Sequence, residues 1–347
     1  MGLLERLRDR RIAAEARRLV RAGDHDKAIA VVTEADRQTS SVSLERELRD
    51  LRYDAFFAHR AEGLDFWPRE VTSLLGPEGR IPEIRADELT VETLTNGVIG
   101  HGSLVVRDLF SADDVSVLRQ CIDGTFDSHD QQLAGHQLAD DEPWFVPFRP
   151  RSPRGEWSDP DRKWFRETCA ELVTDSPRGL ARFIETVQRR GVDRLLADYF
   201  GERPALSVKK TSFRKVPPDH LVDNGWHQDG AFLGEGIRSM NLWIAVTDCG
   251  IDAPSMDMIP RRLNHIVPTG TEGAIFSWSL SKAMVAETAA ASPAQRLVFR
   301  AGDAVFFDEM NLHSTAADPG MTKTRYAIEA WFFAPSRYPM DQIPLLV

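Results

Sequence analysis

Two histidines and one aspartate are the residues of this chain whose types and spacing best suit chemistry. His227 and Asp229 stand two positions apart, and His313 follows far downstream. In an extended chain, residues i and i+2 point to the same face, so one strand can direct both side chains at a single metal ion. Two imidazoles and one carboxylate occupy one face of an octahedral Fe(II) ion and leave the opposite face open. The pattern predicts an iron site with His227, Asp229 and His313 as its ligands.

An arginine behind the second histidine adds to this pattern. His313 follows a Gly302-Asp303 turn and an apolar run, and Arg325 lies at the head of the next apolar run. An arginine can hold a carboxylate through two parallel hydrogen bonds, a geometry that lysine cannot reproduce. Because a buried arginine without a counter-anion is costly, we expect Arg325 to bind the carboxylate of a ligand.

Composition excludes several classes of partner. The 347 residues carry a formal net charge of −10, with 42% hydrophobic and 28% charged residues. This balance is ordinary for a globular protein with a sizeable core and argues against nucleic acid or an anionic membrane as the partner. No stretch approaches the ~20 apolar residues that span a bilayer. The N-terminus runs directly into charged residues without the apolar block of a signal peptide, which predicts a cytoplasmic protein. The three cysteines, widely spaced and odd in number, are expected to be buried free thiols.

The chain divides into three parts. Residues 1–62 show helical spacing of apolar residues between arginines and acids, which predicts an N-terminal helical extension. Residues 63–92 are rich in proline, glycine and acids and are expected to form a linker. The main domain then covers residues 93–347. The extension either packs on this domain or provides a surface for a partner or a homodimer.

Short strands dominate the second half of the chain. We expect a turn and a strand at residues 96–107, a helix at 177–199, and further strands at 205–213, 240–246, 302–307 and 326–333. Short strands separated by Gly, Pro and Asp turns are typical of an antiparallel sandwich or jelly-roll barrel. The fold class is therefore mainly β with helices (α+β): a double-stranded β-helix, that is, a jelly-roll or cupin-like core. The irregular, aromatic segment 140–166 is either an active-site lid or a loop that its aromatic side chains fix to the barrel surface.

Together these motifs resemble the phytanoyl-CoA dioxygenase-like (PhyH-type) family of Fe(II)/2-oxoglutarate-dependent oxygenases. The resemblance covers roughly residues 93–335. It rests on the sequence runs at 96–107, 226–230, 241–245, 301–307 and 313–325.

The resemblance implies a function and a set of site residues. It implies iron on His227, Asp229 and His313, with O2 as oxidant and 2-oxoglutarate as the co-substrate that is converted to succinate and CO2. The far carboxylate of 2-oxoglutarate would be held by Arg325. The other residues implied for the co-substrate pocket are Thr315, Ser314, Trp243 and Asn241. The expected enzyme is an EC 1.14.11-type hydroxylase, or one that uses hydrogen abstraction for desaturation or ring formation.

The substrate is less well defined by the sequence. A pocket with an aromatic cover suits a medium-sized metabolite, and secondary metabolism is one setting for such an enzyme. Arg261 and Arg262 replace the small residues usual in the family at this position, and they either meet an anionic substrate or form a solvated rim. Alternation places Lys210 and Arg214 on one face of their segment, where they either meet a substrate carboxylate or phosphate or face solvent.

Two other functions fit parts of the same pattern. One is a non-catalytic jelly-roll protein that recruits a partner through its N-terminal helices. The other is a zinc-dependent enzyme, since three protein ligands and an open position also serve zinc. Neither gives a reason for an arginine at Arg325, so the oxygenase is the preferred interpretation.

Overall fold

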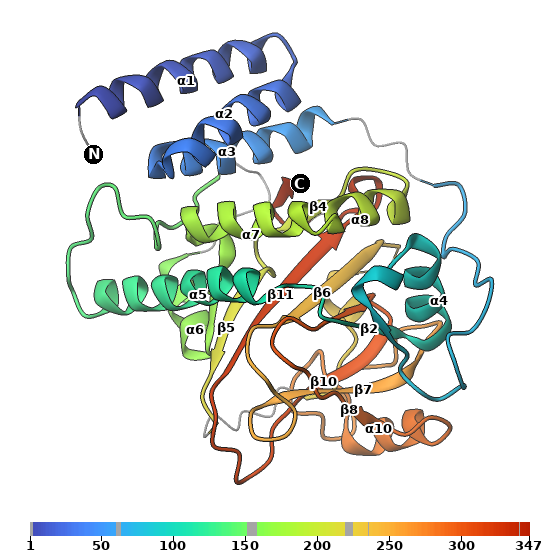
Figure 1. The fold of residues 1–347 in the computed structure, drawn as a ribbon. Helices are drawn as coiled ribbons and strands as arrows, with labels where there is room; N and C mark the ends of the chain where they lie inside the picture. The colour runs from blue at the N-terminus through green and yellow to red at the C-terminus, as the bar shows by residue number, and fades with distance from the viewer. Residues whose placement is uncertain (1–2, 60–63, 151–157, 219–224, 235, 340) are drawn as a thin grey trace.

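A jelly roll of two facing sheets forms the centre of the molecule, with helices on the outer face of the larger sheet (Figure 1). The structure is a computed structural model, and it describes residues 3–59, 64–150, 158–218, 225–234, 236–339 and 341–347. The predicted α+β jelly-roll fold with N-terminal helices is confirmed. No helix in these ranges is both long enough and apolar enough to cross a membrane.

The larger sheet has the strand order β1-β2-β9-β6-β11-β4-β12, and β5 joins β11 to β3. Apart from the parallel pair β1 and β2, the pairs of this sheet are antiparallel. Its strands are β1 Glu83–Arg85, β2 Ser103–Arg107, β3 Ala170–Leu172, β4 Ala205–Ser207, β5 Ser212–Val216, β6 Ser239–Ala245, β9 Ala304–Phe307, β11 Arg325–Phe333 and β12 Pro344–Leu346.

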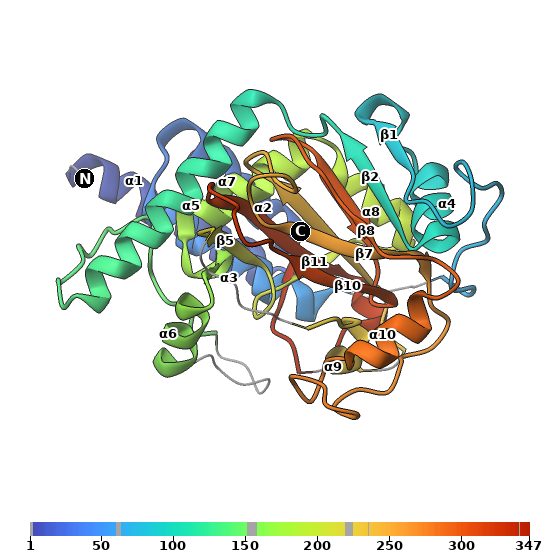
Figure 2. The ribbon, with the colours of Figure 1, turned by 90° about the horizontal axis from the view of Figure 1, so that it is seen from below.

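The smaller sheet has the order β10-β7-β8, with strands β7 Ser255–Arg262, β8 Gln295–Arg296 and β10 Asn311–Ala316. Figure 2 shows its strands on the side of the molecule that carries the short helix α9 (Gly230–Leu233) and α10 (Lys282–Ala289). The larger and smaller sheets enclose an interior lined by side chains of both.

The central strand β11 explains how the two faces of the larger sheet differ. Alternate side chains of a strand point to opposite faces. One set, with Ile328 and Phe332 as examples, is buried in the main hydrophobic core under the helices. The other set includes Arg325, Ala327 and Glu329 and faces the interior between the sheets. The strand is therefore buried on both faces, which requires the interior charges to find partners.

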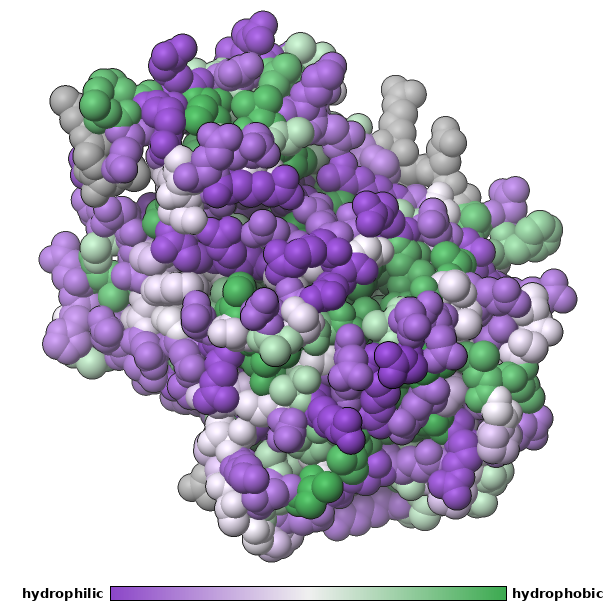
Figure 3. Space-filling view, viewed as in Figure 1, coloured by the Kyte–Doolittle hydropathy of each residue, from purple (hydrophilic) through white to green (hydrophobic). Residues whose placement is uncertain are grey.

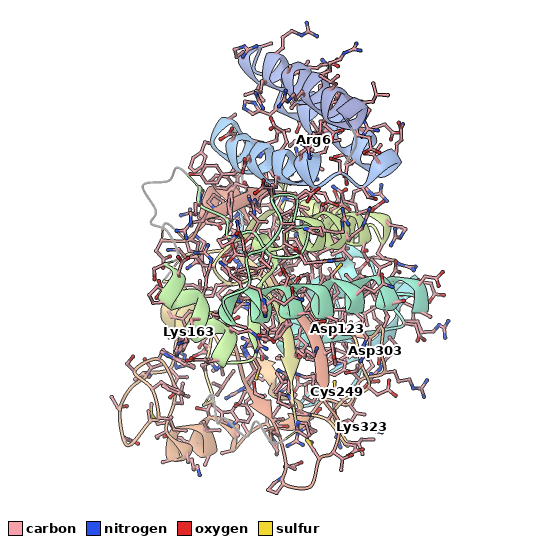
Figure 4. The ribbon with its side chains drawn as sticks, turned by 90° about the vertical axis from the view of Figure 1, so that its left-hand side faces the viewer. Arg6, Asp123, Lys163, Cys249, Asp303 and Lys323 are labelled. Atoms are coloured by element: carbon pink, nitrogen blue, oxygen red, sulfur yellow. The ribbon has the colours of Figure 1, made fainter. Side chains whose placement is uncertain are left out.

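Helices cover the outer face of the larger sheet. They are α4 Val91–His101, α5 Ala112–Leu133, α6 Asp159–Glu167, α7 Pro177–Arg189 and α8 Val192–Phe200, with single 3-10 turns at Ala86–Glu88, Val173–Asp175 and Pro335–Arg337. Asp123 on α5 (Figure 4) joins this layer to the sheet, because its carboxylate accepts hydrogen bonds from Lys215 on β5 at 2.7 Å and Tyr326 on β11 at 2.9 Å. Helix α5 begins with Ser111 as its N-cap, whose side chain accepts a hydrogen bond from the backbone N–H of Asp114.

The N-terminal helices α1 Leu3–Arg21, α2 His25–Thr39 and α3 Val42–Ala58 stack above this layer (Figure 1). Helix α3 packs on the rest of the chain: its Arg49 donates to the carbonyls of Val146 at 3.0 Å and Thr174 at 2.8 Å. Arg52 donates to the carbonyl of Leu346 at 3.1 Å. The outward face of the molecule seen in Figure 3 is mostly hydrophilic, as expected where the helices turn their apolar sides inward.

Several sequence-based boundaries differ from the structure. Residues 96–99 belong to helix α4 rather than to a turn and strand, because Gly97 lets the helix lie against Leu104 of β2: a Cβ there would be 2.7 Å from the Leu104 Cβ. The predicted helix 177–199 is two helices, broken at Gly191 with a φ of 71°. The predicted strand 205–213 is likewise two strands, β4 and β5, separated by a turn.

Two predicted segments have a mixed outcome. The proposed linker contains β1, which adds a strand to the larger sheet. In the candidate lid, residues 151–157, with Trp157, lie outside the described residues. Phe145 and Phe148 are buried, and Phe145 stacks on the imidazole of His129 with ring centroids 3.9 Å apart. Their role as a lid and the domain boundaries stay predictions.

Asp36 gives a test of the packing of the N-terminal helices. Its side chain is buried on α2, and burial, followed by the nearby charge of Glu45, raises its pKa from 3.8 to about 6. The folded state therefore holds this proton more tightly than the unfolded chain. The protonated Asp36 side chain therefore contributes its full stabilisation of the folded state below pH 3.8, and this contribution is lost as the pH rises through about 6.

An asparagine carries no charge at any pH, so we expect the Asp36→Asn protein not to lose stability as the pH rises. At pH 8 its free energy of unfolding should exceed that of the wild type by roughly 1–3 kcal/mol. At pH 4 the two proteins should be nearly equal. Urea unfolding at both pH values measures the difference, with Glu15→Gln on the exposed face of α1 as the control. An Asp36→Asn protein that gains nothing at pH 8 would contradict the burial of a charged Asp36.

Candidate metal centre

His227 and His313 lie side by side on two antiparallel extended segments. The backbone N–H of each donates to the carbonyl of the other, at 2.9 Å and 3.0 Å. Their ring centroids are 4.5 Å apart. Asp229 follows two residues after His227 and immediately precedes helix α9. The structure therefore brings together the three side chains that the sequence predicted as ligands.

The donor atoms of the three residues converge on one point. One ligand atom from each lies within 4.8 Å of the others, and the Oδ1 atom of Asp229 is 3.7 Å from the Nε2 atom of each histidine. Among the described residues, this is the one group of three or more such side chains with metal-binding geometry. The spacing leaves room for an ion between the three donors.

Backbone carbonyls fix the proton on each imidazole. The Nδ1 atom of His227 lies 3.0 Å from the carbonyl of Gly225, and that of His313 lies 3.2 Å from the carbonyl of Asn311. Since a carbonyl can only accept, Nδ1 must carry the hydrogen. Each Nε2 then presents its lone pair to the shared centre, as a metal ligand does.

Burial controls the charge of all three residues. It is the largest cause that lowers the pKa of His227 to about 4 and that of His313 to about 4. The same burial raises the pKa of Asp229 to about 7. The imidazoles are therefore neutral at physiological pH, while the Asp229 carboxylate is held in an environment that disfavours its charge.

The Asp229 carboxylate supplies the test of whether a metal ion fits. Its Oδ1 atom is buried, and it has no hydrogen-bond donor among the described residues. The side chain of Asn241 on β6 is a hydrogen-bond partner of Asp229 and lowers its pKa in part. A divalent cation between two neutral imidazoles would satisfy the unpaired oxygen and stabilise the carboxylate, so the residues present fit a metal ion.

Gln228, which separates the two ligands, was not singled out by the sequence analysis. It is fully buried, and its side-chain amide donates to the carbonyls of His265 and Met310, both at 3.0 Å. Its side-chain oxygen accepts from the N–H of Val267 at 2.8 Å. These bonds fix the segment that carries His227 and Asp229. A polar residue between two ligands, pointing away from the metal, is the signal that could have identified it.

Arg325 lies at the start of β11 in the same interior. It is 3% exposed, and its Nη1 donates to the carbonyl of Ser255 at a long 3.3 Å. Its Nε has no hydrogen-bond partner among the described residues. Its guanidinium carbon is 5.8 Å from the centre of the Trp243 ring. Donors of Arg325 are therefore available to an anionic ligand beside Trp243.

The two hydroxyl residues after His313 point in opposite directions. His313 pairs with Met258, Ser314 with Asp257 and Thr315 with Met256. Alternation thus places Thr315 on the face of His313 and Ser314 on the other face. Ser314 and Thr315 both line a cavity of about 740 Å³, together with Asp257. By strand alternation alone, a co-substrate contact from Thr315 fits the geometry better than one from Ser314, and both contacts stay predictions.

Glu329 is a second interior charge that the sequence analysis missed. It lies opposite Trp243 of β6 and Ser212 of β5. Its carboxylate pairs with Arg214 at 2.9 Å. Arg214 and the charges of Arg325 and His313 lower its pKa despite its burial. Counting in steps of two from Arg325 along β11 would have indicated that Glu329 faces inward.

Aromatic side chains border the partly exposed edge of His227. The Trp278 ring meets the His227 ring edge-on at 5.1 Å, and the Phe232 ring lies at 6.1 Å. Phe232 is also stacked with Trp331 at 5.8 Å. The side of the site next to His227 is therefore apolar and aromatic.

The sequence matches the family described as phytanoyl-CoA dioxygenase (PhyH) over residues 100–319, which is more than half of the chain. The chain belongs to the phytanoyl-CoA dioxygenase family. This membership confirms the resemblance found in the sequence. It also confirms the predicted class, an oxidoreductase of the dioxygenase type, and its cofactors iron(II) and 2-oxoglutarate.

Solved structures similar to this chain share little sequence with it. AviO1 from Streptomyces viridochromogenes Tue57 is 16% identical, with a TM-score of 0.44, over 69% of this chain and 92% of that one. The non-heme alpha ketoglutarate dependent carbocyclase SnoK from nogalamycin biosynthesis is 14% identical, with a TM-score of 0.46, over 72% and 85%. EctD from S. alaskensis with 2-oxoglutarate and 5-hydroxyectoine is 16% identical, with a TM-score of 0.43, over 68% and 73%. No curated protein matches the chain.

The geometry predicts that removal of one imidazole weakens metal binding strongly. We expect His313→Ala to lower the affinity for Fe(II) by more than about 100-fold, because even residues that only orient a ligand change affinity by 10–100-fold. Anaerobic calorimetric titration with Fe(II) measures this, and the rise in melting temperature on adding metal gives a second readout.

His265→Ala serves as the matched control, because the His265 side chain is exposed and lies outside the group of three. It should bind Fe(II) as the wild type does. Equal Fe(II) affinity of His313→Ala and the wild type would contradict the metal centre.

Proposed function

We propose that this protein is an Fe(II)/2-oxoglutarate-dependent hydroxylase that oxidises a small-molecule metabolite at a C–H bond. The observation that carries the proposal is the buried, unpaired Asp229 oxygen between two neutral imidazoles whose lone pairs face it. In this proposal His227, Asp229 and His313 hold the iron. Bound iron(II) and 2-oxoglutarate would supply the activation of O2, with 2-oxoglutarate converted to succinate and CO2.

Arg325 is the proposed anchor for the far carboxylate of 2-oxoglutarate. Its buried Nε without a hydrogen-bond partner among the described residues supports this role, because a buried guanidinium with an unused donor favours an anion. Thr315, Trp243 and Asn241 are proposed to contact the co-substrate from β10 and β6. Ser314 has the weakest support of the predicted set, since it belongs to the other face of β10.

The protein itself orients the metal ligands, sets the charge of the site and excludes water from it. The Nδ1 hydrogen bonds hold both imidazoles in the orientation that presents Nε2. Gln228 fixes the segment between the two ligands, and Asn241 holds the Asp229 carboxylate. Burial excludes water that would compete for the reactive centre. The substrate would then be positioned by the aromatic side chains next to His227, and its position decides which carbon reacts.

Three further expectations belong to this proposal. The substrate is a small metabolite that carries negative charge, and the protein acts in the cytoplasm. A homodimer would form through the N-terminal helices. The exposed Leu4 and Leu7 on α1, at 81% and 47% exposure, are the apolar side chains that such a dimer would cover.

The first test is an anaerobic titration with Fe(II) and then 2-oxoglutarate, which should produce the visible charge-transfer band of the chelate. We expect Arg325→Gln to weaken 2-oxoglutarate binding by about 100-fold, because one partner of a buried charge pair is lost. Arg325→Lys should recover this only in part, since lysine lacks the two-pronged geometry.

Arg300→Gln, at an exposed position, is the control and should leave the band unchanged. A folded, metal-loaded wild type without a band would exclude the oxygenase and favour a zinc enzyme or a non-catalytic binding protein. A normal band in Arg325→Gln would assign the anchor to another residue.

A further inference from the structure

Lys210 lies in the turn between β4 and β5, with its ammonium group against aromatic rings. The Nζ atom is 4.5 Å from the centre of the Phe232 ring and 5.7 Å from that of Trp331. Both rings belong to the aromatic group beside His227, because Phe232 contacts His227 and stacks on Trp331. The cation is therefore held at the edge of the candidate metal centre by side chains that also border it.

The ammonium of Lys210 differs from the basic groups around it in having no oxygen partner in the part of the chain that the structure describes. Lys209 donates to the carbonyl of Asp341 at 3.0 Å. Arg214 pairs with Glu329 at 2.9 Å, and Lys215 pairs with Asp123 at 2.7 Å. Contacts with ring faces attract a cation but accept few of its hydrogen bonds. The donors of Lys210 are thus available to a ligand.

Electrostatics link Lys210 to the centre of the site. Burial lowers the pKa of its ammonium, and the negative charge of Asp229 is the second-largest cause, acting in the opposite direction. Asp341 and Glu329 act in the same direction as Asp229, and Arg214 acts against them. A metal ion held by Asp229 would weaken the attraction of this carboxylate for Lys210, so the ammonium would favour a further anion.

We propose that Lys210 binds the carboxylate or phosphate group of the primary substrate, an organic anion with an aromatic or apolar body. The body would contact the rings of Phe232, Trp278 and Trp331 and be directed toward the face next to His227. This inference rests on the proposed function, since it assigns a substrate class to that same site. It also gives the substrate an anchor separate from Arg325, which serves the co-substrate.

Pairs of matched acids and amides test this proposal without knowledge of the natural substrate. The probes are phenylacetate with phenylacetamide and 1-naphthylacetate with 1-naphthylacetamide. Anaerobic calorimetry measures their binding to the protein loaded with Fe(II) and 2-oxoglutarate. We expect at least one acid to bind the wild type at least about tenfold more tightly than its amide, which corresponds to about 1.4 kcal/mol.

The variants Lys210→Met and Lys209→Met form a matched pair at neighbouring positions. Lys210→Met keeps an apolar stem against the rings and should abolish the preference for the acid. Lys209→Met should retain it, because the Lys209 ammonium bonds a backbone carbonyl elsewhere. Both variants should melt within a few degrees of the wild type and show an unchanged 2-oxoglutarate chelate band.

Each other outcome overturns the assignment in a distinct way. If neither acid is preferred by the wild type, or if Lys210→Met retains the preference, Lys210 is not the substrate anchor. If Lys210→Met weakens the chelate band, the residue belongs to the co-substrate site. If the wild type forms no chelate band, the proposed function itself fails, and this inference fails with it.

Discussion

The site depends on one buried carboxylate. Asp229 is 2% exposed and lies between two imidazoles that burial keeps neutral, so nothing among the described side chains balances its charge fully. Burial of an unpaired charge is among the most costly arrangements in a protein. Here the carboxylate that bears this free-energy cost lies where the three donor atoms converge. A cation bound at that point would remove the cost, so metal binding and local stability would be coupled. The hydrogen bonds of Gln228 and Asn241 then serve to keep this unstable arrangement in place.

The rest of the fold provides a rigid frame for this arrangement. The two faces of strand β11 have different environments. Ile328 and Phe332 are buried in the core under the helices. Arg325 and Glu329 lie on the opposite face, in the interior between the sheets. The larger sheet is therefore fixed from outside by apolar packing, and its inner face is free to carry charge. Helix α3 adds to this frame by donating arginine hydrogen bonds to carbonyls of the main domain. An interior with charges needs such support, since burying charged groups costs free energy that other parts of the fold must offset.

The interior charges follow a consistent pattern. Arg325 has a donor without a partner, Arg214 and Glu329 form a pair, and Lys210 rests against rings without an oxygen partner in the described ranges. An ion pair inside a binding site is already neutral and needs no charged ligand. A cation without an ion-pair partner can bind an anionic ligand. Two unpaired cations at different places are what an enzyme with two anionic ligands would require. The proposed co-substrate and the proposed substrate class therefore depend on the same electrostatic arrangement.

Local sequence patterns predicted the three metal-ligand candidates and most of the strands. The spacing of His227 and Asp229, the run before His313 and the apolar runs that became β6, β9 and β11 are local patterns, and local patterns survive folding. Other features depend on contacts between distant parts of the chain. Gly97 lies in a helix because it packs against Leu104, a contact between distant elements that propensity does not contain. Ser314 lies opposite Asp257 and Thr315 opposite Met256, pairings between strands that the sequence does not contain. The partners of Glu329 and the isolation of Lys210 likewise depend on which strands and rings are brought near them. Such pairings follow only from three-dimensional packing, so no single-chain pattern could have revealed them.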